Sequence, residues 1–187
     1  VDHRLRRDQR KARAAVGEDD AAMNQYLEGK IVPVARLKAI LRRATIAGAI
    51  VPVFCGSALR NKGVQMVLDA VTEFLPSPLD VPPIKGINPL NQEPTDRPAS
   101  VDAPFSALVF KILSDPYVGK LFFTRIYSGK MVSGVPVYNS SKKVKEKISK
   151  ILVMHANKQE IVASASAGEI VALVGLKDSK SGNTLCD

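Results

Sequence analysis

The chain has 187 residues, of which 45% are hydrophobic and 24% are charged, and its formal net charge is +9 at pH 7. This length and composition allow one large or two small globular domains, each with a buried core. No apolar run approaches the roughly 20 residues that a membrane-spanning helix needs, and there is no signal-peptide pattern, so we expect no membrane partner.

The cysteines and histidines exclude several kinds of site. Cys55 and Cys186 are too few and too far apart for a disulfide framework or a zinc site, which favours a reducing, cytoplasmic setting. His3 and His155 have no companions at metal-ligand spacing. We therefore expect no metal site and no catalytic residue. The start at Val1, followed by a basic segment, predicts that the chain begins inside a longer reading frame.

The first part of the chain carries helical patterns. Residues 4–15 are a charged, alanine-containing run that predicts a solvated helix. Asp19 and Asp20 supply an N-cap and a first-turn acid for a short helix through Leu27, before Gly29. Two amphipathic helices follow, with apolar residues at helical spacing. These residues are Leu37, Ile40, Leu41 and Ala44 in the first and Val64, Val67, Leu68, Val71, Phe74 and Leu75 in the second.

An apolar run at residues 50–54 lies between these two helices. Its length and β-branched residues predict a buried strand, with Cys55 as a small buried hydrophobe at its end. The tiny residues Gly56, Ser57 and Ala58 come next. This order is typical of an α/β protein that presents bare backbone amides at the carboxyl edge of a parallel sheet. A plain strand-to-helix turn is the alternative.

Most of the twelve prolines fall in residues 76–104. Proline fixes φ and lacks the amide donor, so this stretch cannot be a helix interior or a central strand. It predicts an extended, semi-rigid connector between two domains. These prolines are Pro76, Pro78, Pro82, Pro83, Pro89, Pro94, Pro98 and Pro104.

After the connector the apolar period changes from helical spacing to two. Strand candidates are residues 105–113, 120–127, 135–138, 144–154 and 169–174. Turn residues separate them, including Asp115-Pro116 and Ser128-Gly129. Several short strands with turns between them predict an antiparallel β-barrel.

Several fragments, in order and spacing, resemble elongation factor G, a family of translational GTPases. The first is Cys55-Gly56-Ser57-Ala58-Leu59, followed by Asn61-Lys62-Gly63-Val64 at the next helix. The others are residues 75–83, 105–111, 119–121, 125–129, 154–158 and 167–178. One departure is Asn183, which stands where the family pattern would have Asp.

The resemblance implies an α/β remnant of a P-loop GTPase domain followed by an antiparallel β-barrel, translation-factor domain II. Residues 1–48 would complete an insert of the GTPase domain, and residues 49–75 would be its last strand and helix. Residues 76–102 would be the linker and 103–187 the barrel. The implied function is that of a fragment of the GTPase that drives ribosomal translocation.

The same resemblance implies an incomplete guanine site at Ser57, Ala58 and Leu59. The family reads the guanine O6 with a backbone amide of this loop, and Ala58 is the residue we expect to supply it. A phosphate loop of the Gly-x-x-x-x-Gly-Lys-Ser/Thr type is absent from the sequence. Val64 stands where Asn-Lys-x-Asp would need its carboxylate. GTP or GDP and Mg²⁺ are thus expected in the parent protein, and no cofactor is expected for this fragment.

A lysine-rich run forms the strongest charged feature of the second half. Its alternation with Val144 and Ile148 predicts that Lys143, Lys145 and Lys147 share one strand face, as contacts to RNA phosphates would require. A lysine-protected edge strand is the alternative. The candidate RNA-binding residues are Lys142, Lys143, Lys145, Lys147 and Lys150.

The resemblance also implies that the barrel contacts the RNA of the small ribosomal subunit, and no DNA partner is expected. Two other functions stay open. One is a paralogous translational GTPase that acts in ribosome recycling or ribosomal protection. The other is a non-catalytic ribosome- or RNA-binding β-barrel module. A phosphate loop upstream in the parent reading frame would separate the GTPases from the module.

Overall fold

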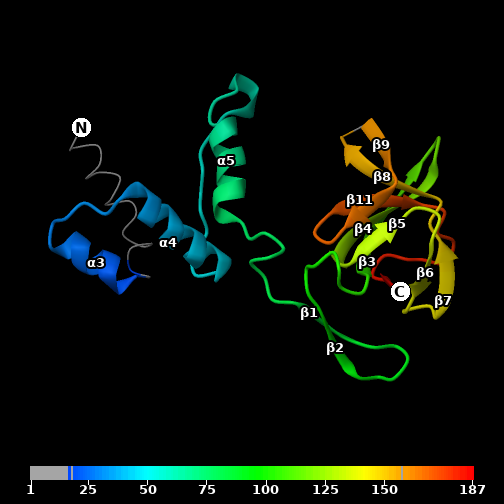
Figure 1. Ribbon diagram of the computed structural model, residues 1–187. Helices are drawn as coiled ribbons and strands as arrows, with labels where there is room; N and C mark the ends of the chain where they lie inside the picture. Colours follow the sequence, from blue (N-terminus) through cyan, green and yellow to red (C-terminus); the bar gives the residue numbers. More distant parts are fainter. Residues whose placement is uncertain (1–16, 18, 157) are drawn as a thin grey trace. The chain divides into compact units, whose positions relative to one another are not determined.

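The computed structural model describes residues 17, 19–156 and 158–187. It divides into two compact units, Val1–Pro76 and Ser77–Asp187, each described by itself below (Figure 1). The helix predicted at residues 4–15 lies outside the described residues. Within the described part, no helix has the length and apolarity needed to cross a bilayer.

Three α-helices form the described part of the first unit: α3 (Asp20–Leu27), α4 (Val34–Ile46) and α5 (Val64–Phe74). Asp19 is the N-cap of α3, as predicted, and its side chain accepts a hydrogen bond from the Ala22 N–H at 2.9 Å. That hydrogen bond, followed by the contact with Arg43, lowers the pKa of Asp19. The helix N-terminus is therefore fixed by the residue that the sequence indicated.

The predicted apolar stripe of α4 is confirmed as part of a small core. Ile40 and Ala44 are buried in α4. Ile40 clusters with Ala22 of α3 and with Val32, which precedes α4. Partly buried hydrophobic residues complete this cluster, and they are Met23, Tyr26, Leu37, Leu41 and Ile50.

The buried strand predicted at residues 50–54 is wrong for the described structure. This segment is extended but pairs with no strand among the described residues, and Val51 and Val53 are 82% and 84% exposed. Its Phe54 ring stacks on Phe74 of α5, with centroids 6.3 Å apart. A strand needs hydrogen-bonding neighbours, and the described part of this unit supplies none.

The second unit begins with a hairpin inside the predicted connector. Strands β1 (Ile84–Ile87) and β2 (Pro94–Arg97) pair antiparallel, with Ile84 opposite Arg97 and Ile87 opposite Pro94. The segment is extended, as its prolines predicted, but it is more ordered than a simple connector. Pro94 is tolerated because it is the first residue of its strand in a two-stranded sheet, which has only edge strands.

An antiparallel β-barrel follows, and its prediction is confirmed. The main sheet has eight strands in the order β7-β6-β12-β3-β4-β11-β8-β9, and β5 and β10 form a separate pair. The strands of the main sheet are β3 (Ser106–Asp115), β4 (Gly119–Ser128), β6 (Pro136–Asn139), β7 (Val144–Lys147), β8 (Lys150–His155), β9 (Lys158–Val162), β11 (Ile170–Val174) and β12 (Thr184–Cys186). The pair consists of β5 (Lys130–Val132) and β10 (Ser164–Ser166).

The barrel core is built by the inward-facing residues of these strands. Its largest fully buried side chains are Phe122, Ile126, Met131, Ile148, Ile151, Leu173 and Leu185. Buried and more exposed residues alternate along the second half of β4, where Thr124, Ile126 and Ser128 are buried and Arg125 and Tyr127 are partly exposed. The two-residue period of the sequence therefore corresponds to the two faces of the sheet.

The run at residues 144–154 differs from its prediction as one strand. The chain leaves β7 at Lys147 and enters β8 at Lys150, and these two strands lie far apart in the order of the sheet. Between them Ile148 is fully buried, and the Ser149 N–H donates to the Val174 carbonyl at 2.8 Å. The apolar pattern continues through this crossing, so it could not reveal the break.

One buried carboxylate joins several parts of the barrel. Glu146 in β7 is only 5% exposed. Its Oε1 accepts hydrogen bonds from the backbone N–H groups of Lys177, Asp178 and Ser179 at 2.8, 2.8 and 3.2 Å. Its Oε2 accepts from the Ser179 hydroxyl and from Asn139 Nδ2. Burial raises the pKa of Glu146, but these hydrogen bonds outweigh it and hold the pKa below its ordinary value of 4.5.

We predict that Glu146→Gln lowers the free energy of unfolding of the barrel by about 2–4 kcal/mol at pH 7. The amide keeps one acceptor oxygen but turns an NH₂ toward groups that already donate. Urea unfolding followed by tyrosine fluorescence measures the change. Glu160→Gln, a matched control at an exposed position, is expected to change stability by less than about 0.5 kcal/mol.

The same carboxylate predicts how the stability of the barrel depends on pH. The pKa of Glu146 is lower in the folded chain than in the unfolded chain. The ionised side chain therefore contributes fully to the free energy of unfolding above its ordinary pKa, and this contribution is lost as the pH falls through the lowered pKa of the folded chain. Between about pH 5 and pH 3 the wild-type protein should therefore lose more stability than Glu146→Gln. An equal loss in both proteins would contradict the role given to this carboxylate.

Candidate functional site

The loop that precedes α5 is closed by its own backbone. The Ser57 N–H donates to the Lys62 carbonyl at 2.9 Å, and the Lys62 N–H donates to the Ser57 carbonyl at 3.0 Å. The short 3₁₀ helix η1 (Ala58–Arg60) lies between them, and Asn61 ends it with φ of 49°. Ser57 therefore shapes this turn through both of its backbone groups.

Two glycines allow the close backbone approach at the base of this loop. Gly63 has φ of 76°, and an added Cβ would lie 2.9 Å from the Cys55 carbonyl oxygen. At Gly56 an added Cβ would lie 2.8 Å from the Lys62 carbonyl oxygen. Any side chain at either position would force the backbone apart, so the loop depends on both glycines.

The closed loop leaves two amide donors available. Within the described part of the chain, no acceptor bonds to the N–H of Ala58 or of Leu59. Both residues are exposed, and Leu59 is 98% exposed. Two neighbouring N–H groups at a tight turn suit a carbonyl oxygen or another small acceptor. The small Ala58 side chain leaves its amide open to such a group.

The other residues near this loop supply no further ligand-binding chemistry. Asn61 adopts a left-handed turn conformation, and Lys62 closes the bridge to Ser57. Cys55, predicted to be buried, is an exposed free thiol, because the segment that carries it has no neighbouring strand to cover it. Among the described residues, no group of His, Cys, Asp and Glu is arranged to hold a metal ion.

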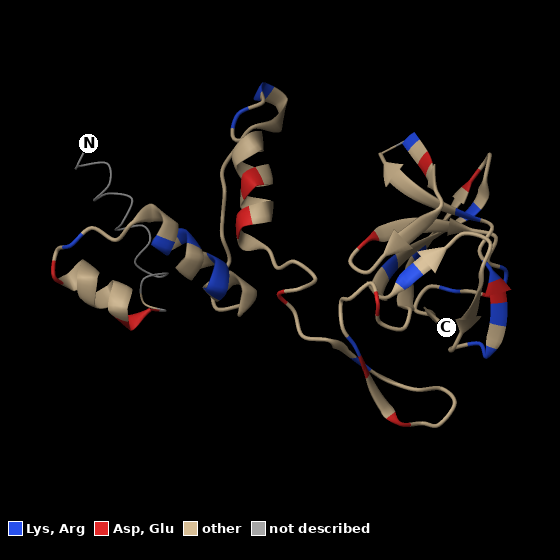
Figure 2. Ribbon diagram, viewed as in Figure 1, with Lys and Arg blue, Asp and Glu red and all other residues tan. Residues whose placement is uncertain are grey.

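The lysine-rich run forms a basic edge on the barrel. Lys145 and Lys147 are exposed on β7, while Glu146 between them faces inward. Strand β7 is at one edge of the main sheet, and among the described strands it pairs with β6 alone, with Lys145 opposite Tyr138 and Lys147 opposite Pro136. Figure 2 shows these blue segments along β7.

The prediction that Lys143 shares a strand face with Lys145 and Lys147 is wrong. Lys143 lies in the turn before β7, with φ of 58°, and the Lys142 N–H donates to Asn139 Oδ1 at 3.0 Å. Lys150 belongs to β8, which is remote from β7 in the sheet order. The tight turn and the crossing therefore leave two of the five lysines on β7, one on β8 and two in the turn before β7. This geometry fits both an RNA-contacting face and an edge protected by lysine.

A cavity beside the barrel was not predicted from the sequence, because the residues that line it are distant in the chain. It is lined by the β1–β2 hairpin and by residues of β3, β4 and β12, among them Arg97, Tyr127 and Cys186. The lone cysteine near the end of the sequence gave no signal for this arrangement.

Comparisons with known proteins relate the chain to a known family. Residues 104–187 match the family model described as Elongation factor G domain 2. Elongation factor G of Dehalococcoides mccartyi is 52% identical over 170 residues, which are 91% of this chain and 24% of that protein. The chain therefore spans about a quarter of the length of this curated relative.

A solved structure extends the likeness to the fold. The crystal structure of ttk003000868 from Thermus thermophilus superposes with a TM-score of 0.69 at 24% sequence identity. The match covers 96% of this chain and 24% of that chain. At this identity the likeness shows the fold alone.

Residues 104–187 therefore match a translation-factor β-barrel domain, which follows a helical unit. The chain is similar over 91% of its length to part of elongation factor G, the likeness that the sequence motifs predicted.

We predict that Gly63→Ala destabilises the first unit by about 2 kcal/mol or more, because it adds a close contact to the strain of a positive φ. Gly29→Ala is a matched control with φ of 73° and open space around the new methyl group, and about 1 kcal/mol is expected. Thermal unfolding followed by circular dichroism at 222 nm reports on these helices. Equal effects of both substitutions would show that the close approach is unimportant.

Proposed function

We propose that the chain is the part of a translational GTPase that carries one guanine-contacting loop and the ribosome-facing barrel. The intact protein would bind GTP with Mg²⁺, hydrolyse it and drive translocation on the ribosome in the cytoplasm. The observation that carries the proposal is the closed loop at residues 57–62, with two available amides, placed before α5 and followed by domain 2.

The loop supports this proposal through its donors. The guanine O6 is an acceptor, and the Ala58 N–H is an exposed donor on a backbone held by the Ser57–Lys62 bridge. One or two neutral hydrogen bonds contribute only about 0.5–1.5 kcal/mol each. This loop therefore needs a phosphate loop and a base-specific carboxylate from elsewhere in the parent protein, and this chain by itself is expected to be inactive.

The exposed apolar surface of the first unit supports the same proposal. Val67, Leu68 and Val71 of α5 are 42–63% exposed, although they belong to its apolar stripe. Val51 and Val53 are exposed on the neighbouring extended segment. In an intact GTPase domain, further strands would pair with residues 50–54 and cover this apolar surface.

The barrel contributes a second part of the function. Lys145 and Lys147 give the β7 edge two exposed positive charges, and no acidic side chain is exposed on that strand. We propose that this edge contacts phosphates of small-subunit ribosomal RNA, and that Lys142, Lys143 and Lys150 are secondary candidates. A recycling or ribosomal-protection GTPase would use the same parts, and the remaining domains of the parent would separate these functions.

A stand-alone RNA-binding module remains the alternative from a different class. It would need only the barrel and its lysines. The reading frame upstream distinguishes the two, because a GTPase requires a phosphate loop and Asn-Lys-x-Asp there. Their absence would leave the module as the better proposal.

We predict that the 187-residue chain shows no GTP binding tighter than about 1 mM by titration calorimetry with Mg²⁺.

In the intact protein, Ala58→Pro should weaken guanine-nucleotide binding about tenfold, because proline has no amide hydrogen. The extended Ser57, with ψ of 102°, can precede proline, so the loop can still form. Leu59→Ala keeps every amide and serves as the control. Tight Mg²⁺-dependent binding of GTP to the isolated chain would contradict the proposal that the rest of the nucleotide site lies elsewhere in the parent protein.

We predict that Lys145→Gln/Lys147→Gln weakens binding to small ribosomal subunits and lowers the slope of log K against log salt by about 1–2. Filter binding between about 50 and 200 mM potassium chloride measures the slope, over the range where phosphate contacts are sensitive. Lys158→Gln/Lys177→Gln removes the same charge outside β7 and should change binding less. An unchanged slope in the β7 variant would favour the role of edge protection.

A further inference from the structure

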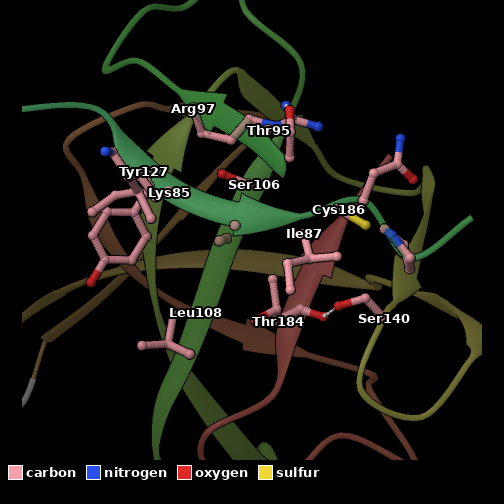
Figure 3. A pocket seen from close by; sticks show the side chains of 15 residues that line it. Lys85, Ile87, Thr95, Arg97, Ser106, Leu108, Tyr127, Ser140, Thr184 and Cys186 are labelled. Carbon is pink, nitrogen blue, oxygen red and sulfur yellow. Dashed lines mark hydrogen bonds between the residues drawn. The ribbon is translucent and has the colours of Figure 1, made fainter. Parts of the chain in front are cut away.

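The cavity beside the barrel lies between the β1–β2 hairpin and the outer face of β3 and β12. Along β3, Ala107 and Val109 point into the core, which leaves Ser106 and Leu108 on the outer face. On β12, Leu185 is fully buried and Thr184 and Cys186 line the cavity. Strand β1 crosses over β3 (Figure 3), and the volume of the cavity, which is open on one side, is about 280 Å³.

The lining has an apolar part and a cationic part (Figure 3). Ile87 of β1 points toward Thr184, and Leu108 extends the apolar surface on β3. Lys85 and Arg97 are the charged residues that line the cavity within the described structure, and no Asp or Glu lines it. Arg97 lies with Thr95 on the covered face of the hairpin, whereas Lys85 lies opposite Asp96 on the exposed face. A ligand here would therefore meet the Arg97 guanidinium and an apolar wall.

The cations have hydrogen-bonding capacity to spare. Arg97 Nη1 donates to Thr95 Oγ1 at 2.6 Å and to the Asp96 carbonyl, which leaves most of its five donors unused. No carboxylate among the described residues forms an ion pair with Lys85 or Arg97. Their charges are thus available to an anion.

A third cation lies in an adjoining smaller cavity, which shares Ile84, Arg97 and Tyr127 with the first. Arg125 lines it, and its guanidinium lies 5.5 Å from the centroid of the Tyr127 ring. Arg125 Nε is buried and has no hydrogen-bond partner in the described structure. A buried N–H without an acceptor is costly, and a water molecule or a ligand oxygen in the smaller cavity would satisfy it.

Two carboxylates limit the positive charge around the cavity. Asp187 accepts the Phe105 N–H at 3.0 Å through both of its oxygens, and its charge raises the pKa of the Cys186 thiol more than Arg97 lowers it. Asp96 lies opposite Lys85 in the hairpin, on the exposed side of β2. Among the residues that line the cavity, Arg97 is therefore the cation on the covered face of the hairpin.

We propose that this cavity binds a small amphipathic organic anion, with a carboxylate or a phosphate monoester at Arg97 and an apolar body against Leu108 and Ile87. Arginine recognises both head groups through paired N–H donors. The volume is at the lower limit of small-molecule sites, so it fits a single ring or a short alkyl chain. The proposal is independent of GTP binding.

Cys186 provides a reporter inside the cavity. Its thiol is half-buried, and burial, followed by the charge of Asp187, raises its pKa, while Arg97 acts in the opposite direction. The other thiol, Cys55, is exposed in the first unit. In a Cys55→Ser chain, an occupant of the cavity should shield Cys186 from a neutral reagent such as 4,4′-dithiodipyridine.

The experiment measures the rate of Cys186 modification in the full Cys55→Ser chain with phenylacetate, phenyl phosphate or the neutral phenylacetamide. We expect at least one of the two anions to slow the reaction saturably, by about fivefold or more, and the amide to have little effect. Comparison of the two anions identifies the preferred head group. Equal protection by the amide, or no protection by either anion, would overturn the proposal.

Charge variants complete the test. Arg97→Gln should raise the half-protecting anion concentration about tenfold, as expected for a lost charge-assisted hydrogen bond. Arg97→Lys keeps the positive charge but loses the paired N–H donors, so it should also weaken protection, and it provides a second variant if Arg97→Gln fails to fold. Lys145→Gln removes the same charge outside the cavity and should leave protection unchanged. Unchanged protection in both cavity variants would overturn the proposal.

Discussion

The buried carboxylate of Glu146 is the interaction on which much of the barrel depends. It joins β7, the Asn139 amide of β6 and the backbone of residues 177–179, which lead toward β12. A buried charge is tolerated only when hydrogen bonds satisfy it, and here five donors do so. This geometry fixes an edge strand that would otherwise be held by β6 alone.

Two surfaces follow from that constraint. Because Glu146 points inward, its neighbours Lys145 and Lys147 must point outward, so one buried residue orients the basic edge. The loop held by the same carboxylate precedes β12, whose Thr184 and Cys186 form part of the cavity wall. The basic edge and the cavity are therefore separate surfaces that share one structural support.

The loop of the first unit is held by local backbone contacts and not by a buried carboxylate. Its loop is held locally by the Ser57–Lys62 bridge and by two glycines, and it keeps its shape without a sheet beside it. The segment before it has no such local support and stays extended and exposed. A local backbone motif can thus persist where a strand, which needs partners, does not. This contrast agrees with a chain that spans about a quarter of its curated relative.

The sequence by itself determined the local elements of this protein. The N-cap at Asp19, the apolar stripe of α4 and the turns at Asp115 and Gly129 depend on nearby residues, so their patterns were sufficient. The motifs were also sufficient to predict the likeness to elongation factor G. The tertiary structure decided the separation of β7 from β8, the exposure of Cys55 and the β1–β2 hairpin. It alone brought Arg97, Arg125 and Cys186 to adjoining cavities. Strand pairing and burial join residues far apart in the chain, and a pattern read along one segment carries no information about its partner.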